Sequence, residues 1–140
     1  MTYLYAVEVT TRHRILIVDD EESTRLLLAS LMTHDLDAEV QLAGSSAQAL
    51  RLAEMYVYDA ILLDLLMPGM DGLTLLERIR AGTPNAGTPV VVVSVLGDAQ
   101  TEQRARRLGA NAYHVKPVRR ATLAATVKAQ IAARSCALIR

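Results

Sequence analysis

The sequence predicts an α/β fold: a doubly wound (βα)5 sandwich, in which helices cover both faces of a parallel five-stranded sheet. Two observations lead to this prediction. Short apolar runs alternate five times with stretches of helical periodicity, the order found in parallel sheets with right-handed crossovers. Several of the runs also lack alternating polar residues, as strands buried on both faces do. The chain has 140 residues, of which 51% are hydrophobic, so it is long enough for one such domain.

Each predicted strand is an apolar run that ends at a turn residue or a polar side chain. In the first, third and fourth strands the run is continuous, and Asp19, Asp64 and Ser94 stand at or directly after its end. The second strand ends at Gly44 and the short fifth strand at Lys116. The predicted strands cover residues 14–18, 38–43, 60–63, 90–94 and 112–115.

The helices between these strands are predicted from apolar side chains spaced three and four residues apart. In the first helix, Leu27, Leu28 and Leu31 have the spacing of a core face. Before the second helix, Ser45 and Gln48 form the pattern of a capping box. The predicted helices cover residues 23–34, 46–55, 72–80, 99–108 and 119–135.

The chain divides into three parts around this domain. Residues 1–13 are an N-terminal extension, residues 14–135 are the predicted domain and residues 136–140 are a C-terminal tail. Apolar residues alternate in the extension with a period of two, so it could add an edge strand or pair with another chain. A weakly ordered tail agrees equally well with its terminal position.

Charge and composition exclude several classes of protein. The formal net charge is zero, so nothing draws the chain as a whole to nucleic acid or membrane. The charge is uneven, because residues 1–97 carry 13 acids and 6 Lys or Arg, and residues 98–140 carry 2 acids and 9 Lys or Arg. Cys136 is the only cysteine, and no apolar run approaches the roughly 20 residues of a membrane helix. The first residues also lack the basic start of a signal peptide, so we expect a cytoplasmic location.

Polar side chains stand at the carboxyl ends of four predicted strands. Asp19 and Asp20 follow the first strand, Asp64 follows the third, Ser94 ends the fourth and Lys116 follows the fifth. These ends meet at one edge of a parallel sheet, which is where α/β proteins bind ligands. Each close pair of carboxylates costs roughly 1 to 4 kcal/mol. Lys116 offsets part of this repulsion, and a hard divalent cation would offset the rest. Mg²⁺ fits best, because it binds carboxylates together with water and phosphate oxygens.

This set of side chains suits phosphoryl transfer to a carboxylate. An aspartate beside a cation and an ammonium group can act as a nucleophile and form an aspartyl phosphate. The positive charges neutralise the transferring oxygens, and the Ser94 hydroxyl can donate a hydrogen bond to one of them. Each residue alone has a simpler explanation, as a turn former, a helix cap or a solvated side chain. Their combination at four strand ends favours the phosphoryl site.

At these residues the chain resembles the receiver domain of two-component response regulators, and it is similar to the stand-alone, chemotaxis-regulator-like members. The resemblance extends from residue 14 to about residue 135, and its motifs have the order and separations of the family. It implies a flavodoxin-like sheet in the order 2-1-3-4-5. The matching motifs are residues 15–21, 64–72, 93–94, 109–113 and 115–117.

The resemblance implies roles for the acidic residues. It makes Asp64 the phosphoacceptor, and it gives the Mg²⁺ ligands as Asp19, Asp20, Asp64 and the main-chain carbonyl of Leu66. The phosphoryl group would come from a sensor histidine kinase or a histidine phosphotransfer protein. A receiver catalyses only its own phosphorylation and dephosphorylation, so the resemblance implies that the chain is not an enzyme in the usual sense.

The resemblance also implies roles for the other site residues. Lys116 contacts the phosphoryl group, and Ser94 donates a hydrogen bond to it. Tyr113 is the switch aromatic, expected to turn inward when Ser94 moves toward the phosphate. This movement would carry the signal to the face formed by the last two helices and the strand between them. The Lys116-Pro117 peptide bond is expected to be cis.

Four residues depart from the usual pattern of the family. Val95 stands where Ala or Gly usually follows the hydroxyl, so it could narrow the access to Asp64. Leu66 and Leu96 stand where polar side chains often guide the hydrolytic water, which predicts slow loss of the phosphoryl group. Thr122 replaces a glutamate that is usual in receivers that dimerise to bind DNA. With no effector domain in the sequence, this residue argues against direct DNA binding.

Two surfaces are candidates for contacts with other proteins. Leu26 and Met32 widen the apolar stripe of the first helix beside the acidic site, where the family docks its histidine-bearing partner; core packing explains them equally well. The last two helices carry a basic face, which favours an acidic partner or a self-contact such as a homodimer; the output protein is unknown. This face comprises Arg104, Arg106, Arg107, Arg119, Arg120, Lys128 and Arg134.

Three functions are compatible with these residues. The first is a phosphorylation-dependent signalling switch whose output face binds a target protein. The second is a phosphorelay shuttle that passes the phosphoryl group from Asp64 to a second histidine protein. The third is a magnesium-dependent phosphohydrolase. That chemistry usually needs Asp-x-Asp after the first strand, where this chain has Asp19-Asp20-Glu21, and a cap domain, which the sequence lacks.

Overall fold

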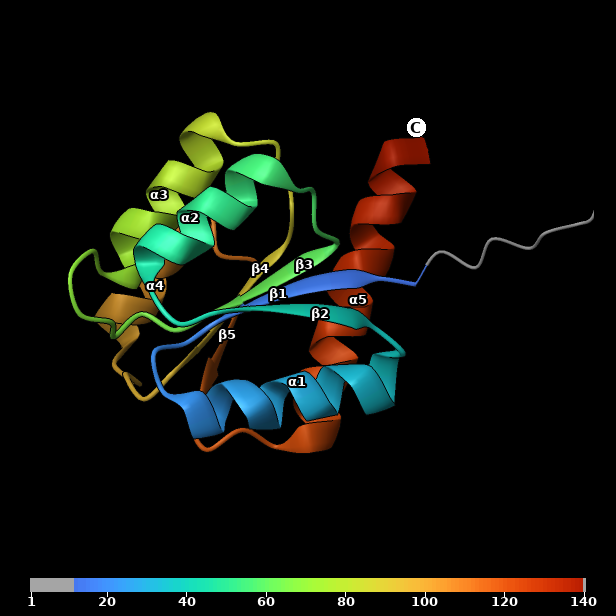
Figure 1. Cartoon of the computed structure of the whole chain (residues 1–140), viewed down its shortest axis with the longest axis horizontal. Coiled ribbons are helices and arrows are strands. Elements are labelled where there is room, and N and C mark those ends of the chain that lie inside the picture. The colour runs from blue at the N-terminus through green and yellow to red at the C-terminus, as the bar shows by residue number, and fades with distance from the viewer. Residues whose placement is uncertain (1–11, 140) are drawn as a thin grey trace, which may run out of the picture.

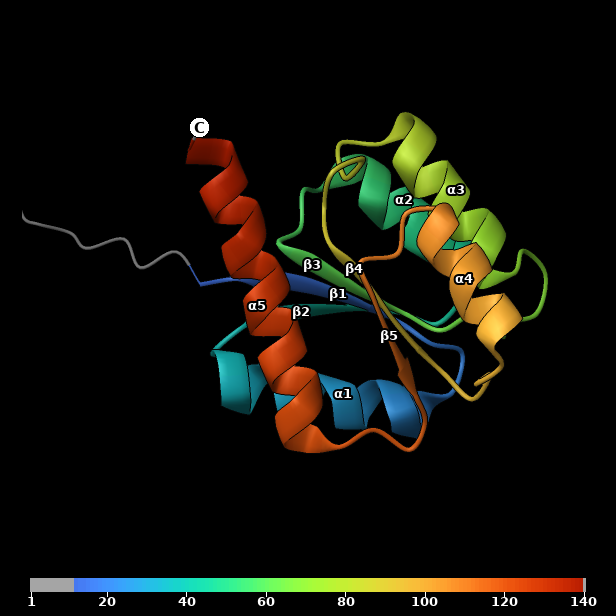
Figure 2. The ribbon, with the colours of Figure 1, turned by 180° about the vertical axis from the view of Figure 1, so that it is seen from behind.

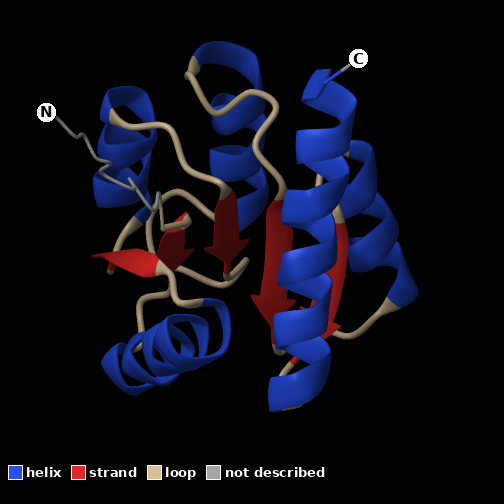
Figure 3. Cartoon of the chain, turned by 90° about the vertical axis from the view of Figure 1, so that its right-hand side faces the viewer, coloured by secondary structure: helices blue, strands red, loops and turns tan. Residues whose placement is uncertain are grey.

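The computed structural model describes residues 12–139, in which a parallel sheet lies between two layers of helices (Figures 1 and 3). The strand order is β2-β1-β3-β4-β5 and all adjacent strands are parallel, so the predicted fold is confirmed. The strands are β1 (Arg14–Val18), β2 (Glu39–Ala43), β3 (Ala60–Leu63), β4 (Val90–Ser94) and β5 (Ala112–Val115). The helices are α1 (Glu22–Leu36), α2 (Ser46–Met55), α3 (Gly72–Gly82), α4 (Ala99–Arg107) and α5 (Arg120–Ile139).

Each face of the sheet has its own hydrophobic core, because successive side chains of a strand point to opposite faces. On one face, Leu16 and Leu63 pack with residues of α2, α3 and α4. On the other face, Ile17 and Leu62 pack with residues of α1 and α5. The central strands are continuous apolar runs in the sequence because both of their faces are buried. Burying one such side chain stabilises the folded state by about 1.5–3 kcal/mol.

The core side of α1 differs from the prediction. Leu28, Leu31 and Met32 are buried, whereas Leu26 and Leu27 are each 55% exposed. The placement of Leu27 in the core was therefore wrong, and Met32 is a core residue rather than part of a surface stripe. The helix turns about 100° per residue, so Leu28, Leu31 and Met32 share one face and Leu27 lies beside it.

The ends of the helices differ from the prediction by a few residues. α1 continues two residues further than expected and is followed by Asp37, whose φ of 51° lies in the left-handed region. α5 runs to Ile139 instead of ending near residue 135, since neither proline nor glycine interrupts it. The predicted tail, residues 136–140, is thus helical as far as Ile139. The alternating pattern in the extension lies outside the described residues.

The caps of three helices follow from the sequence. The Ser45 hydroxyl accepts a hydrogen bond from the Gln48 main-chain N–H, as predicted, although the Gln48 side chain accepts from Gly44 rather than from Ser45. Asp71 and Asp98 cap α3 and α4 in the same way. Within residues 12–139, no helix combines the length and the apolar character that crossing a membrane requires.

Candidate functional site

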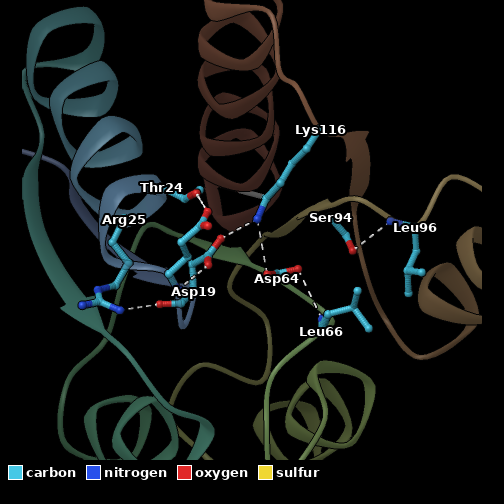
Figure 4. Close-up of polar contacts among 9 residues, drawn as sticks. Asp19, Thr24, Arg25, Asp64, Leu66, Ser94, Leu96 and Lys116 are labelled. Carbon is cyan, nitrogen blue, oxygen red and sulfur yellow. Dashed lines mark hydrogen bonds and ion pairs between the residues drawn. The ribbon is translucent and has the colours of Figure 1, made fainter.

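The side chains predicted to form the site lie together at the carboxyl edge of the sheet (Figure 4). Asp19 follows β1, Asp64 follows β3, Ser94 ends β4 and Lys116 follows β5. Main-chain hydrogen bonds hold these strand ends in register: the Asp64 N–H donates to the Val18 carbonyl (2.9 Å) and the Lys116 N–H to the Ser94 carbonyl (2.8 Å). Parallel pairing therefore brings together residues that are up to 97 positions apart in the chain.

Two buried carboxylates share one lysine. Asp19 and Asp64 are buried, and Lys116 Nζ lies 2.7 Å from Asp19 Oδ2 and 3.3 Å from Asp64 Oδ2. Burial raises the pKa of Asp64, although the charge of Lys116 opposes this, and the charge of Asp19 raises it further. Burial alone would lower the pKa of Lys116, but its hydrogen bond to Asp19 and the charge of Asp64 raise it. The lysine therefore remains charged and offsets part of the repulsion.

Asp20 completes an acidic cluster that fits a divalent cation. Asp19, Asp20 and Asp64 each offer one carboxylate oxygen, and these oxygens lie within 4.8 Å of one another. Asp20 is exposed, so one side of the cluster is open to water. Mg²⁺ binds a few carboxylates and keeps several waters, which agrees with this donor set. Three carboxylates against one lysine also leave a net negative charge for a cation to neutralise.

Two leucines belong to the loops that carry Asp64 and Ser94. The Leu66 N–H donates to Asp64 Oδ1 (3.3 Å), and the Leu96 N–H donates to Ser94 Oγ (3.3 Å). Each loop thus folds back on the polar side chain two residues before it. In Figure 4 both leucine side chains lie on the side of Asp64 away from Lys116. Leu66 is 48% exposed and Leu96 is half-buried, so this side of the site is partly apolar.

Val95 lines a groove that adjoins the site at Lys116. This groove has a volume of about 340 Å³ and lies between α1, the end of β4 and the segment after β5. Asp64 is not among its lining residues, so the structure gives no support for Val95 narrowing the access to that carboxylate. The groove is mostly apolar, and Val95 (58% exposed) and Leu27 contribute much of its open surface. Its lining comprises Thr24, Leu27, Leu28, Val93, Val95, Lys116, Pro117 and Val118.

Tyr113 links β5 to the loop after β4. Its ring is half-buried against the core on the α4 side, and its hydroxyl donates to the Leu96 carbonyl (2.6 Å). Burial raises the pKa of Tyr113, and the charge of Asp98 adds to this effect. The Lys116-Pro117 peptide bond is cis, as expected.

The sequence analysis missed two residues that hold the site in place. Arg25 Nη1 donates to the Asp19 main-chain carbonyl (2.9 Å), so α1 fixes the segment between β1 and itself. Gly72 packs directly behind the loop that follows β3, because a Cβ on it would lie 2.5 Å from the Asp64 carbonyl oxygen. The position of Arg25, on the first turn of a helix that follows paired acids, could have indicated this contact. Nothing local to Gly72 indicated its contact.

The fold and the site define a class: flavodoxin-like α/β proteins with an acidic pocket at the carboxyl edge of the sheet. Comparison with known proteins identifies the family within this class. The model of the response regulator receiver domain matches residues 15–128, so the chain belongs to that family. Receiver domains are signalling switches of two-component systems rather than classical enzymes; they bind Mg²⁺ in the acidic pocket and interact with histidine kinases or phosphotransfer proteins.

The chain is similar both to short and to longer members of the family. It is 29% identical over 111 residues to a probable chemotaxis protein CheY of Rhizobium etli, covering 79% of this chain and 86% of that protein. It is 34% identical over 125 residues to the DNA-binding response regulator MtrA of Mycolicibacterium smegmatis, covering 87% of this chain but 52% of that protein. The chain thus spans about half the length of such longer relatives.

A solved structure bears on the acidic pocket. The chain superimposes with a TM-score of 0.79, at 28% identity, on the receiver domain of the sensor histidine kinase PA1611 from Pseudomonas aeruginosa PAO1. The match covers 87% of this chain and 99% of that one, which has a magnesium ion coordinated in its active-site cleft.

Proposed function

We propose that this chain is a phosphorylation-dependent switch of a two-component system, in which Asp64 accepts a phosphoryl group from a histidine kinase or phosphotransfer protein. The observation that carries the proposal is the placement of Asp64: a buried carboxylate that shares the ammonium of Lys116 with a second buried carboxylate, Asp19. A carboxylate in this setting is a nucleophile whose surroundings already hold the positive charge that the transferred oxygens need.

Each residue of the site has a proposed part in the transfer. An Asp64 oxygen attacks phosphorus, the P–N bond to the donor histidine breaks, and the released imidazole takes up a proton. Lys116, now 3.3 Å from Asp64, turns to the phosphoryl oxygens, and the Ser94 hydroxyl donates to one of them. Asp19, Asp20, Asp64 and the Leu66 carbonyl would hold Mg²⁺, which supplies charge neutralisation at those oxygens.

The signal would leave the site through Ser94 and Tyr113. The Ser94 hydroxyl accepts from the Leu96 N–H, and the Tyr113 hydroxyl donates to the Leu96 carbonyl, so one residue connects the two. When Ser94 turns to the phosphoryl group, it releases that N–H. The loop and Tyr113 then rearrange, which changes the face formed by α4, β5 and α5. That face would bind the output protein or a second copy of the chain.

Labelling with acetyl phosphate tests the phosphoacceptor. We expect wild-type protein with Mg²⁺ to gain one phosphoryl group, and Asp64→Asn or chelation of Mg²⁺ with EDTA to abolish the gain, as measured by intact mass. Asp71→Asn is the matched control, because Asp71 is an exposed helix cap and asparagine caps equally well. Equal labelling of Asp64→Asn at the same site and rate would refute the proposal.

The groove beside Lys116 is the proposed docking site of the histidine-bearing partner. Exposed Leu27 and Val95 line it, and the adjacent Leu26 is also exposed, so apolar surface lies next to the reacting carboxylate. We expect Leu27→Asp to slow transfer from a panel of phosphorylated histidine phosphotransfer domains but to leave labelling by acetyl phosphate unchanged. Equal transfer rates for the variant and the wild type would place the partner elsewhere.

A phosphorelay shuttle is the alternative within the same chemistry. Mixing the phosphorylated chain with unphosphorylated histidine phosphotransfer domains separates the two: onward transfer of label supports the shuttle, and retention supports the switch. No observation favours the phosphohydrolase. Sustained turnover of p-nitrophenyl phosphate by the wild type, lost in Asp64→Asn, would revive it.

A further inference from the structure

Arg80 joins two loops that are far apart in the chain. It lies near the C-terminal end of α3, and its guanidinium reaches the loop before β4 and the turn after α4. Nη1 donates to the carbonyls of Asn85, Ala86 and Thr88 at 3.2, 3.1 and 2.6 Å. Nε and Nη2 both donate to the carbonyl of Gly109, at 3.2 and 2.7 Å. One side chain therefore holds both loops against α3.

The turn after α4 is shaped to receive this guanidinium. Gly109 has a φ of +112°, and a Cβ on it would lie 2.7 Å from Arg80 Nε, so a larger residue could adopt neither the backbone angle nor the contact. Asn111 Oδ1 accepts from Arg80 Nη2 (2.9 Å) and also from the Val90 N–H of β4 (2.8 Å). The Gly109-Ala110-Asn111 part of the family motif thus has a physical explanation that lies outside the phosphorylation site.

The acceptors around Arg80 are all neutral oxygens. Four are main-chain carbonyls and the fifth is the amide oxygen of Asn111, and none of the ion pairs among residues 12–139 includes Arg80. Burial lowers the pKa of Arg80, and the charge of Arg134 lowers it further. Burying a charge without a counter-charge is unfavourable. The hydrogen bonds of Arg80 therefore have to offset that cost, and what they achieve is to hold the two loops against α3.

Apart from this contact, α4 is weakly attached to the domain. Ala105 is its only buried residue, and most of its other side chains are polar. In Figure 2, α4 lies at the edge of the molecule beside β5. Its N-terminal end follows the loop that a single hydrogen bond, from Tyr113 to the Leu96 carbonyl, ties to β5. Its C-terminal end leads into the turn that Arg80 holds with three hydrogen bonds. The two ends are thus attached very unequally.

We propose that Arg80 is a positioning residue that keeps the C-terminal end of α4 fixed, so that phosphorylation moves its N-terminal end. The inference rests on the proposed function, because the signal reaches α4 through Ser94 and the Leu96 loop. With its C-terminal end fixed at Gly109, α4 swings about that end when the Tyr113 contact changes. The surface that α4 offers to a partner then changes its orientation, and the helix does not shift as a whole.

Amide hydrogen exchange of the full chain tests the fixed end, with Arg80→Lys as the variant. Lysine keeps the charge and most of the length but cannot bond several carbonyls in a fixed fork. We expect the amides of residues 104–109 to exchange at least tenfold faster in Arg80→Lys than in the wild type, and those of β1 and β3 to stay within twofold. Arg78→Lys is the matched control, because Arg78 is an exposed residue of the same helix. Asn111→Ala, which removes one acceptor, should give a smaller increase.

Treatment with acetyl phosphate and Mg²⁺ tests the moving end. In the wild type, phosphorylation should change exchange in residues 96–102 and leave residues 104–109 unchanged; in Arg80→Lys both stretches should change. Unchanged exchange of residues 104–109 in unphosphorylated Arg80→Lys, or equal acceleration in β1 and β3, would overturn the inference. Absence of label on wild-type Asp64 would instead refute the proposed function, and the comparison of unphosphorylated proteins would still decide whether Arg80 fixes α4.

Discussion

At the scale of single residues, Asp64 carries a charge that the fold disfavours. Burial and the neighbouring Asp19 raise its pKa despite Lys116. An acid whose pKa is higher in the folded than in the unfolded state binds protons more tightly when folded, so stability falls as pH rises from the unfolded pKa through the folded pKa. At neutral pH, ionised Asp64 therefore destabilises the domain, and under the proposed function this uncompensated charge is what would bind a cation and attack a phosphoryl group.

Removing this charge should stabilise the protein. In Mg²⁺-free buffer at pH 7, we expect Asp64→Asn to raise the free energy of unfolding by about 1 kcal/mol, the scale of one like-charge pair in a high dielectric. Urea denaturation measures the gain, with Asp71→Asn as the neutral control. The gain should shrink as pH falls below the pKa of Asp64, because the wild-type carboxyl is then protonated. A variant less stable than the wild type at pH 7 would contradict this account of the site.

Leu66 and Leu96 should set the lifetime of the phosphorylated form. Both lie on the side of Asp64 away from Lys116, where a hydrolytic water would otherwise be oriented by a polar group (Figure 4). We expect Leu66→Asn and Leu96→Glu to speed the loss of the phosphoryl group by up to roughly 10²-fold, the lower end of what a positioned polar group contributes. Decay of the phosphorylated mass in the absence of donor measures it, and Leu26→Asn, an exposed leucine of α1, serves as control. Decay of the wild type within seconds, unaltered in both variants, would disprove the role of the leucines.

At the scale of elements, α1 illustrates how far a sequence pattern reaches. The apolar spacing predicted a helix with a core face and located it to within two residues. It could not tell which of three adjacent leucines faced the core, because the five large apolar residues among residues 26–32 fit more than one face. The packing of α1 on β1 and α5 makes that choice, and it leaves Leu26 and Leu27 at the surface beside the groove.

Two neighbouring leucines of α1 should therefore respond very differently to truncation. Leu28→Ala should lower the free energy of unfolding by about 2–4 kcal/mol, because it leaves a cavity between α1 and the sheet. Leu27→Ala should change it by less than about 0.5 kcal/mol, because that side chain is exposed. Urea denaturation of the pair checks both values. Equal losses would mean that the face of α1 is assigned wrongly.

At the scale of the whole molecule, the sequence predicted the parts that depend on repetition. The alternation of apolar runs and helical stretches predicts a parallel sheet. A parallel sheet brings the residues at its strand ends to one edge, here Asp19, Asp64, Ser94 and Lys116. What escaped prediction depends on side chains that reach across the fold. Arg80 contacts Gly109, 29 residues later, by a guanidinium whose direction no local pattern contains. α5 exceeded its predicted length because its sequence contains no stop signal.

Cation binding should be visible in the stability of the entire domain. A ligand that binds only the folded state adds about 2.7 kcal/mol at 100 times its Kd. We expect Mg²⁺ to raise the Tm of the wild type progressively with concentration, and Asp19→Asn to remove most of this dependence because one buried ligand of the cluster is lost. Differential scanning fluorimetry with MgCl₂ and with NaCl of matched ionic strength measures it. An equal rise in both salts would indicate general screening instead of a site.

The contact of Gly72 with the Asp64 carbonyl limits how this protein can be engineered. Replacing a helical glycine by alanine is a common way to make a domain more robust, and Gly72 opens α3. Here the added methyl would press on the backbone of Asp64, eight positions earlier. Thermostability programmes and statistical sequence designs should therefore keep glycine at this position, because alanine would strain the backbone instead of making the domain more robust.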